Sequence, residues 1–274
     1  MNGAASDGRR DRISDADAIR ALPHFVVAID GPSGAGKSTI AKAAAGALGI
    51  DYIDTGAMYR AVALKILRNG IALPEGGAGL GADADSDAGS GAGGAALSLA
   101  LAPLNAMLSE TVVDLDGGST LLDGEDVSGL IRTPEVTMMA SKCSALPVVR
   151  AKLVALQRDM GAKKSVIMDG RDIGSNVFPN ARFKFFITAS PQVRAGRRHL
   201  EMLGKGVDAR YADVLADIEK RDFNDSHRAV NPLVKTDDAI EIFTDDMGIE
   251  EVLACVIARM SPSPQGSPAL GETF

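Results

Sequence analysis

A stretch near residue 30 contains residues that together bind phosphate in many proteins. The sequence FVVAIDGPSGAGKSTIAK, over residues 25–42, holds the pattern G-x-x-x-x-G-K-[ST] at Gly31, Gly36, Lys37 and Ser38. Glycines let the backbone curl until its N–H groups point inward at anionic oxygens. A lysine at this place reaches the β- and γ-phosphates, and the next hydroxyl ligates Mg²⁺ directly or through water. The pattern therefore predicts a site for a nucleoside triphosphate with Mg²⁺ at Ser38.

The residues around the pattern have the required context. An apolar run over residues 25–29 predicts a strand, and residues 37–48 predict a helix, so a loop joins the two. The start of the helix adds unpaired N–H groups and partial positive charge. We expect the Lys37 side chain to lie at the protein surface in the absence of nucleotide. The residues expected at the triphosphate are Gly31, Pro32, Ser33, Gly34, Ala35, Gly36, Lys37, Ser38 and Thr39.

Arginines beside small polar or acidic residues occur in four other places. They are DTGAMYR (54–60), SKCSALPVVR (141–150), MDGRDIG (168–174) and KRDFNDSHR (220–228). The guanidinium group offers paired donors that match phosphate oxygens, although a single arginine at a helix end is usually solvated. The triphosphate loop alone leaves GTPase, ATPase, kinase and motor functions open. A second anion site built from these arginines favours a kinase.

Strands and helices alternate along the chain. The pattern predicts strands over 25–30, 111–115, 165–169, 182–187 and 239–243, and helices over 37–48, 57–68, 134–146, 148–160, 191–202, 209–223 and 250–260. Thr133 before Pro134, and Ser190 before Pro191, are typical N-caps with proline at the first helical position. The alternation predicts an α/β fold with a parallel sheet covered on both faces. Asp169 ends a predicted strand, where it either binds Mg²⁺ through water or caps the strand.

Three segments depart from this alternation. The stretch PEGGAGLGADADSDAGSGAGGAA, residues 74–96, has almost no large apolar side chain to offset the entropy of ordering it. It is therefore expected to be an unstructured, tolerated surface insertion. Residues 112–129 contain DGGS, which predicts a hairpin outside the main sheet, in a small lobe inserted in the first half of the chain. Residues 1–23 and 261–274 are expected to be flexible tails around one domain over residues 24–260.

Composition limits the possible partners and compartment. The 274 residues suit one large α/β domain, and 46% hydrophobic residues suffice for its core. A net charge of -7 argues against a general nucleic-acid surface, and no apolar run is long enough to span a membrane. Cys143 and Cys255 have no metal spacing, which favours reduced thiols in a cytoplasmic protein.

The chain resembles the bacterial cytidylate kinases from about residue 25 to residue 260. The matching pieces are IDGPSGAGKST, DTGAMYR, DGEDVSGLIRTPEV, LPVVR, DGRDIGSNVFP and RDFNDSHRAVNPL. The resemblance implies the nucleoside monophosphate kinase fold, a P-loop kinase fold with a parallel core sheet flanked by helices. It also implies an acceptor-binding insert at about residues 55–150 and a mobile helical lid at about residues 190–210. The implied reaction transfers the γ-phosphoryl group of ATP to CMP or dCMP with Mg²⁺.

The resemblance also implies roles for individual residues. The acceptor phosphate is expected at Arg60, Arg171 and Arg228, the cytosine at Ser141, Arg150 and Asp172, and the sugar at Arg221 and Asp225, with Thr55, Tyr59 and Asp169 completing the acceptor site. A carboxylate accepts from the N4 amino group of cytosine while a guanidinium donates to N3 and O2. Uracil reverses two of these groups, so Asp172 and Arg150 are expected to reject it.

The expected lid contains three arginines within about one helical turn. Arg194, Arg197 and Arg198 either close onto the transferring phosphoryl group or form a solvated basic face. Two other functions stay open: a kinase for another small molecule, such as AMP or shikimate, and a nucleotide-dependent switch protein. The chain is expected to act as a monomer on ATP and CMP or dCMP, without a nucleic-acid or membrane partner.

Overall fold

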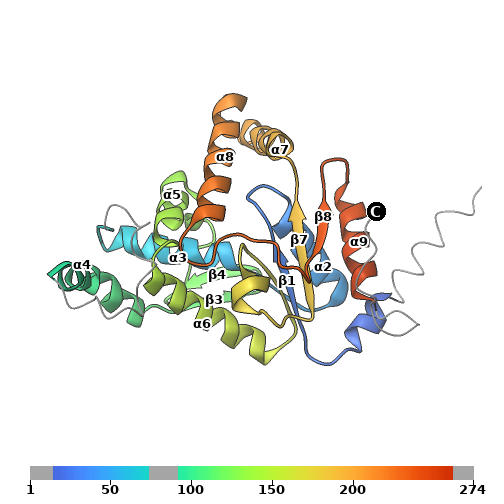
Figure 1. Cartoon of the computed structure of the whole chain (residues 1–274), viewed down its shortest axis with the longest axis horizontal. Helices are drawn as coiled ribbons and strands as arrows, with labels where there is room; N and C mark the ends of the chain where they lie inside the picture. Colours follow the sequence, from blue (N-terminus) through green and yellow to red (C-terminus); the bar gives the residue numbers. More distant parts are fainter. Residues whose placement is uncertain (1–14, 74–91, 262–274) are drawn as a thin grey trace, which may run out of the picture.

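The centre of the protein is a five-stranded parallel sheet. The computed structural model describes residues 15–73 and 92–261, and its sheet has the strand order β2-β6-β1-β7-β8 (Figure 1). These strands are Val26–Asp30 (β1), Asp51–Asp54 (β2), Val166–Asp169 (β6), Phe183–Thr188 (β7) and Ile240–Phe243 (β8). All neighbours pair in parallel, so the predicted sheet is confirmed, and β2 is the strand that the sequence pattern missed.

Helices cover both faces of the sheet. Alternate residues of β1 point to opposite faces, so Val27 and Ile29 pack in one apolar cluster while Val26 and Ala28 pack in another. The first cluster includes α2 (Lys37–Leu48) and α9 (Ile249–Met260). The second includes α3 (Thr55–Arg68), α5 (Pro134–Cys143) and α6 (Pro147–Lys163). A strand that is apolar on both faces is what a sheet buried between helices requires.

A small antiparallel sheet forms the inserted lobe. Its strands are β3 (Val113–Asp116), β4 (Ser119–Leu122) and β5 (Glu125–Asp126). Gly117 and Gly118, between β3 and β4, have φ values of 54° and 90°, which a tight hairpin turn favours and side chains disfavour. The predicted hairpin is therefore confirmed. The 3₁₀ turn Leu130–Arg132 (η2) follows it and leads to α5.

One helix of the lobe begins inside the low-complexity segment. Residues 74–91 of the predicted insertion lie outside the described residues, and its last residues form the start of α4 (Ala92–Ser109). The expectation of an unstructured segment up to residue 96 is wrong for this end. The cause is the apolar second half of α4, where Leu104, Met107 and Leu108 are buried in the core.

Two helices stand beyond the carboxyl ends of the strands. They are α7 (Pro191–Gly204) and α8 (Tyr211–His227), which lie side by side in Figure 1. Both predicted N-caps are confirmed: Ser190 Oγ accepts from Val193 N at 3.3 Å, and Thr133 Oγ1 accepts from Val136 N at 3.3 Å. A short π-helical turn, η3 (Ile173–Val177), follows β6.

The predicted N-terminal tail is too long. Residues 15–20 are helical, and the Ile19 side chain is fully buried in the cluster with α2 and α9. Arg20 donates to the carbonyl oxygens of Leu48 at 3.1 Å and Ala47 at 2.6 Å, near the end of α2. These carbonyls lack partners within a helix, so a cation there satisfies them. The segment from residue 15 onward is therefore part of the folded domain.

Ile19→Ala is expected to lower the free energy of unfolding by about 2–5 kcal/mol, the usual effect of truncating a buried large aliphatic side chain. Denaturant unfolding measures this value. Ile249→Ala is the matched control, because Ile249 is 56% exposed and its loss should change the free energy by less than about 0.5 kcal/mol. Equal effects of the two substitutions would show that residues 15–23 do not contribute to the core.

Candidate active site

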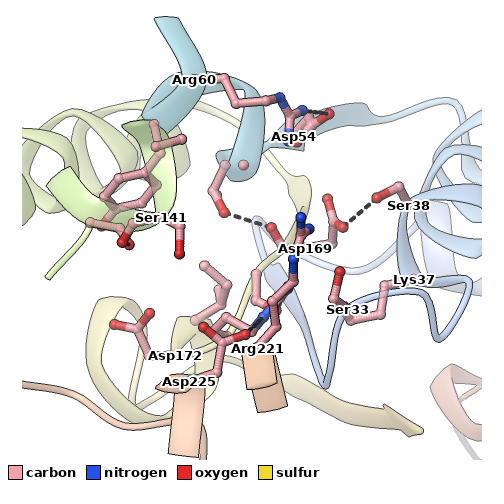
Figure 2. A pocket seen from close by; sticks show the side chains of 18 of the residues that line it. Ser33, Lys37, Ser38, Asp54, Arg60, Ser141, Asp169, Asp172, Arg221 and Asp225 are labelled. Atoms are coloured by element: carbon pink, nitrogen blue, oxygen red, sulfur yellow. Dashed lines mark hydrogen bonds and ion pairs between the residues drawn. The ribbon is translucent and has the colours of Figure 1, made fainter. Parts of the chain in front are cut away.

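A cavity of about 500 Å³ opens at the carboxyl ends of the central strands. Asp30, Asp54 and Asp169 are the last residues of β1, β2 and β6, so the sheet brings three loops to this edge. In Figure 2 the side chains of Ser33, Lys37 and Ser38 lie on one side of the space, and those of Ser141 and Asp172 on the other. Open parallel sheets bind ligands at this edge.

The glycine-rich loop follows β1 and forms one wall. Gly34 and Gly36 have φ values of 79° and 87°, a left-handed conformation that side chains disfavour. A Cβ atom at Gly31 would lie 2.0 Å from the carbonyl oxygen of Ile187, so this position needs glycine for close packing. Ser33, Gly34, Lys37, Ser38 and Thr39 line the cavity, whereas Gly31, Pro32, Ala35 and Gly36 are not among its lining residues.

Lys37 is buried, contrary to the expectation that it lies at the surface. Its side chain is 5% exposed, and Nζ donates to the carbonyl oxygen of Pro32 at 2.7 Å. Burial, and next the positive charge of Arg171, lower the pKa of Lys37 to about 7. The ammonium group thus bonds to its own loop at the edge of the cavity, because the curled backbone places a carbonyl within its reach.

We expect ATP to bind with uptake of a proton at pH 8. Without ligand the pKa of Lys37 is about 7, so the amine is mostly neutral at pH 8, and nearby phosphates favour its charged form. Calorimetry of a non-hydrolysable ATP analogue in two buffers of different ionisation enthalpy counts the proton. Lys37→Arg is the control, since a guanidinium keeps its charge in this range. Identical heats in the two buffers at pH 8 would contradict the prediction.

Asp169 joins the phosphate loop to the sheet. Its Oδ2 accepts from Ser38 Oγ at 2.7 Å, its Oδ1 accepts from Tyr52 Oη at 2.8 Å, and its backbone oxygen accepts from Thr55 Oγ1 at 2.7 Å. Burial, and next the charge of Asp54, raise the pKa of Asp169 above its ordinary value. Its carboxylate therefore faces the loop instead of only ending the strand.

Ser38 and Asp169 are suited to Mg²⁺. A hydroxyl and a carboxylate are hard oxygen ligands, and Mg²⁺ commonly uses one or two such groups, with waters and substrate phosphates completing the octahedron. Residues 15–73 and 92–261 contain no group of three or more His, Cys, Asp or Glu that could hold a metal. The donor set at Ser38 and Asp169 fits an ion that arrives with phosphates.

A turn after β6 places two acceptor residues. Asp30 accepts from the backbone N–H groups of Ile173 at 2.8 Å and Gly174 at 2.7 Å. Burial is the main cause that raises the pKa of Asp30 to about 6, and these two hydrogen bonds oppose the rise. Asp30 thereby fixes the segment that carries Arg171 and Asp172 beside the phosphate loop.

Three arginines predicted at the acceptor phosphate line the same cavity. Arg60 lies 3.2 Å from Asp54, Arg171 Nε lies 2.6 Å from Asp225, and Arg228 lies 3.0 Å from Asp172. Figure 2 shows the pair of Arg60 with Asp54. Among the described residues, the buried Nε atom of Arg60 has no hydrogen-bond partner. Each of the three guanidiniums has one carboxylate partner there, so each keeps donors for a further anion.

The residues predicted at the cytosine form a buried polar cluster. Asp172 Oδ2 accepts from Arg150 and from Asn176 Nδ2, and Oδ1 accepts from Arg228. An ionised carboxylate has about four lone-pair sites, so one acceptor position remains on Asp172. Tyr59 and Ser141 line the adjoining wall. The predicted sugar residues also line the cavity, with Arg221 on the same helix as Asp225.

The residues that were not predicted include two that line the cavity, Arg132 and Gln157, and one beside it, Tyr52. Tyr52 lies on the missed strand β2 and contacts Asp169. Arg132, 4.0 Å from Asp54, lies in the piece DGEDVSGLIRTPEV, which had signalled the lobe but not this side chain. Gln157 is buried two helical turns after Arg150 on α6, and its Nε2 has no partner among residues 15–73 and 92–261. That spacing places Arg150 and Gln157 on one face of the helix and was the available signal.

None of the three lid arginines lines this cavity. Arg197 donates to the backbone oxygen of Thr244 at 2.6 Å, and Arg198 pairs with Glu201 in solvent at 2.9 Å. Arg194 is buried against Asp222. Only Arg198 fits the alternative of a solvated face, and contact of any of the three with a phosphoryl group stays a prediction for another state of the lid.

A phosphate loop that faces an arginine-rich second site across one cavity defines a P-loop kinase for a small anionic acceptor. The family model described as cytidylate kinase matches residues 27–261, and the chain belongs to the cytidylate kinase family. The cytidylate kinase of Clostridium perfringens is 43% identical over 236 residues, which cover 86% of this chain and 97% of that protein.

A second relative agrees with the first. The cytidylate kinase of Caldanaerobacter subterraneus is 43% identical over 240 residues, covering 88% of this chain and 96% of that protein. The alignment with a solved gluconokinase from Sinorhizobium meliloti covers 87% of this chain and 94% of that one, with a TM-score of 0.43 and 13% identity. The predicted family and kinase activity are confirmed, and the switch alternative is not favoured.

Proposed function

We propose that the protein transfers the γ-phosphoryl group of ATP to CMP and dCMP. The observation that carries the proposal is the shared cavity, where the phosphate loop at Lys37 and Ser38 faces the polar cluster at Arg150 and Asp172. A donor triphosphate on the loop and an acceptor nucleotide on the cluster would meet between them. Family membership supports the same reaction.

In this mechanism the protein holds two anions in line. The loop amides and Lys37 bind the donor phosphates, and Arg60, Arg171 and Arg228 bind the acceptor phosphate. The arginines now pair with Asp54, Asp225 and Asp172, and these pairs pre-orient the guanidiniums. Because the acceptor phosphate is already anionic, the reaction needs no general base, and positioning and charge neutralisation supply the rate.

The base is proposed to bind at Arg150 and Asp172. The free acceptor position on Asp172 suits the N4 amino group of cytosine, and Arg150 suits N3 and O2. The Nε atom of Arg150 is buried and has no partner in the part of the chain that the structure describes, which supports a ligand acceptor nearby. The same arrangement opposes uracil, because its O4 would meet the carboxylate. Arg221 and Asp225 are proposed at the sugar.

Mg²⁺ is proposed to bind with the donor phosphates, held by Ser38 and, directly or through water, by Asp169. The ion would neutralise phosphate charge as the phosphoryl group moves. The residues of the chain bind it, and Tyr52 holds Asp169 in place through its 2.8 Å hydrogen bond.

A coupled assay of ADP release over a panel of nucleoside monophosphates tests the function. We expect CMP and dCMP to give the highest kcat/KM, UMP to be at least about tenfold poorer, and AMP to be inactive at the same concentration. Equal rates with AMP or with water alone would overturn the acceptor assignment.

We also propose that the protein acts as a monomer in the cytoplasm. One chain supplies every residue of the cavity, and ATP and nucleoside monophosphates are metabolites of that compartment. Both cysteines are free thiols, which agrees with a reducing environment. Light scattering at micromolar concentration gives the mass, and a dimer of about twice the 28.4 kDa chain would contradict the proposal.

A further inference from the structure

Arg194 is buried between the phosphate loop and α8. The residue is 2% exposed, and its guanidinium makes four hydrogen bonds. Two go to the carboxylate oxygens of Asp222 at 2.9 and 2.5 Å, one to Ala189 O at 2.8 Å, and one to Ser33 O at 3.0 Å. Because a guanidinium has five N–H donors, this arrangement occupies nearly all of them. A planar, paired fork of this kind fixes position more than a flexible ammonium would.

The contact with Ser33 O sets the direction of one peptide in the phosphate loop. In a trans peptide the C=O and the following N–H point to opposite sides. Ser33 and Gly34 line the cavity, whereas Arg194 is not among its lining residues. The carbonyl of Ser33 is therefore directed away from the cavity, and the N–H of Gly34 is directed into it, where the donor phosphates are proposed to lie.

Packing supports the same arrangement. A Cβ atom at Gly34 would lie 3.4 Å from Cβ of Arg194, so the loop rests against the stem of this side chain. Gly34 has a φ of 79° and, being glycine, has no side chain that restricts its own peptide. A hydrogen bond from outside the loop is then the means of selecting one peptide orientation, since glycine restricts its own backbone least.

Asp222 connects this contact to the acceptor side. It lies on α8, next to Arg221 and one turn before Asp225, and both of these residues line the cavity. Asp222 itself holds Arg194 through two hydrogen bonds. A continuous chain of contacts thus runs from the helix that carries the acceptor residues to the loop proposed to bind ATP.

We propose that Arg194, held by Asp222, is a positioning residue that orients the Ser33–Gly34 peptide toward the donor phosphates. It acts through the loop and not by contact with the transferring phosphoryl group. The inference rests on the ATP binding proposed above. It predicts that losing the hydrogen bonds of Arg194 to Asp222 and Ser33 weakens ATP binding, although Arg194 itself does not contact ATP.

The test measures the Kd for a non-hydrolysable ATP analogue and, separately, for CMP. Arg194→Lys should raise the Kd for the analogue at least about tenfold, because an ammonium cannot hold Asp222 and Ser33 together. Asp222→Asn should raise it about three- to tenfold. In both variants the Kd for CMP should change by less than about twofold, and the amide resonance of Gly34 in NMR spectra should shift.

Ser190→Ala is the matched control. Ser190 caps the same helix, and its partners Val193 and Asp245 lie outside the phosphate loop. The substitution should lower the melting temperature while leaving the Kd for the analogue and the Gly34 resonance unchanged. If Arg194→Lys and Ser190→Ala both leave the Kd unchanged, Arg194 only anchors the helix and the inference is overturned.

A second outcome also overturns it. If Asp222→Asn leaves or strengthens analogue binding while Arg194→Lys weakens it, the arginine contacts the nucleotide itself after release from Asp222. An error in the proposed function would give a different result from an error in this inference. In that case the unmodified protein would bind the analogue but would not phosphorylate CMP.

Discussion

Lys37→Met is expected to lower kcat/KM for phosphoryl transfer by about a hundred- to a thousandfold in a folded protein. The charge proposed to stabilise the donor phosphates is lost, and removing one such group from a preorganised site has this effect. Initial rates with CMP and ATP, measured beside circular dichroism spectra, check the result. Lys163→Met is the control and should retain full activity, because Lys163 is exposed and pairs with Asp159 outside the cavity lining.

The same substitution, Lys37→Met, should not lower the stability of the protein, although it lowers activity. Burial lowers the pKa of Lys37 from 10.5 to about 7, so the folded state disfavours the charged amine. This penalty is fully present below pH 7 and disappears above the unfolded value of 10.5. Lys37→Met should therefore melt at or above the temperature of the unmodified protein at pH 6, and the two should converge by pH 10. A folded variant with more than about a tenth of the normal activity would refute the role of Lys37 in phosphate binding.

Asp172→Asn is expected to lower the ratio of kcat/KM for CMP to that for UMP by at least about tenfold. The amide can rotate to accept or to donate, so it weakens binding of cytosine and also rejection of uracil. A contact of this kind discriminates by roughly 1–3 kcal/mol. The change should fall mostly on KM for the acceptor, and parallel assays with the two nucleotides measure it.

The same substitution should reduce stability, because Arg150 and Arg228 both donate to Asp172 inside the protein. Asp238→Asn, which removes a partner of Lys184 that is not among the cavity-lining residues, should leave the nucleotide ratio unchanged. If Asp172 only holds the two arginines in shape, the efficiencies for CMP and UMP will fall together with their ratio constant. That outcome would remove Asp172 from base recognition.

The sequence predicted the elements whose patterns are local. The loop before Lys37 and the caps at Thr133 and Ser190 are recognisable from a few adjacent residues, and the structure confirms each. The strand β2 was missed because its four residues, DYID, contain two carboxylates and no apolar run. Its place is set by pairing with β6, whose residues lie more than a hundred positions later.

Composition also gave wrong predictions for two segments that looked unstructured but belong to helices of the folded domain. The glycine-rich stretch hides the start of α4, a helix that contacts α3 and α6 and whose residues Leu104, Met107 and Leu108 are buried. Likewise, three of the eight residues in the ISDADAIR piece near residue 15 are charged, but Ile19 packs in the core with α2 and α9. Contacts with distant helices, which the local pattern does not contain, decide both cases.

The candidate site was predicted better than the directions of its side chains. All the residues expected at the acceptor line one cavity, although their individual roles remain predictions. The hydrogen bond from Lys37 to the carbonyl oxygen of Pro32 and the burial of Arg194 were not predictable. Both depend on carbonyl groups that the folded loop presents. Ser33 and Arg194 are 161 positions apart in the chain, so no local pattern links them.

The central place of β1 has a consequence for how the protein forms in the cell. Val26 pairs with Val166, Val27 pairs with Phe183, and Phe25 N donates to Ser165 Oγ, so both neighbours of β1 are synthesised long after it. During translation β1 leaves the ribosome with both of its edges open and both of its faces apolar, a state prone to association with other chains. Pairings of such long sequence separation also slow folding. The phosphate loop is therefore made before β6 and β7, and its backbone is fixed only after those strands pair with β1.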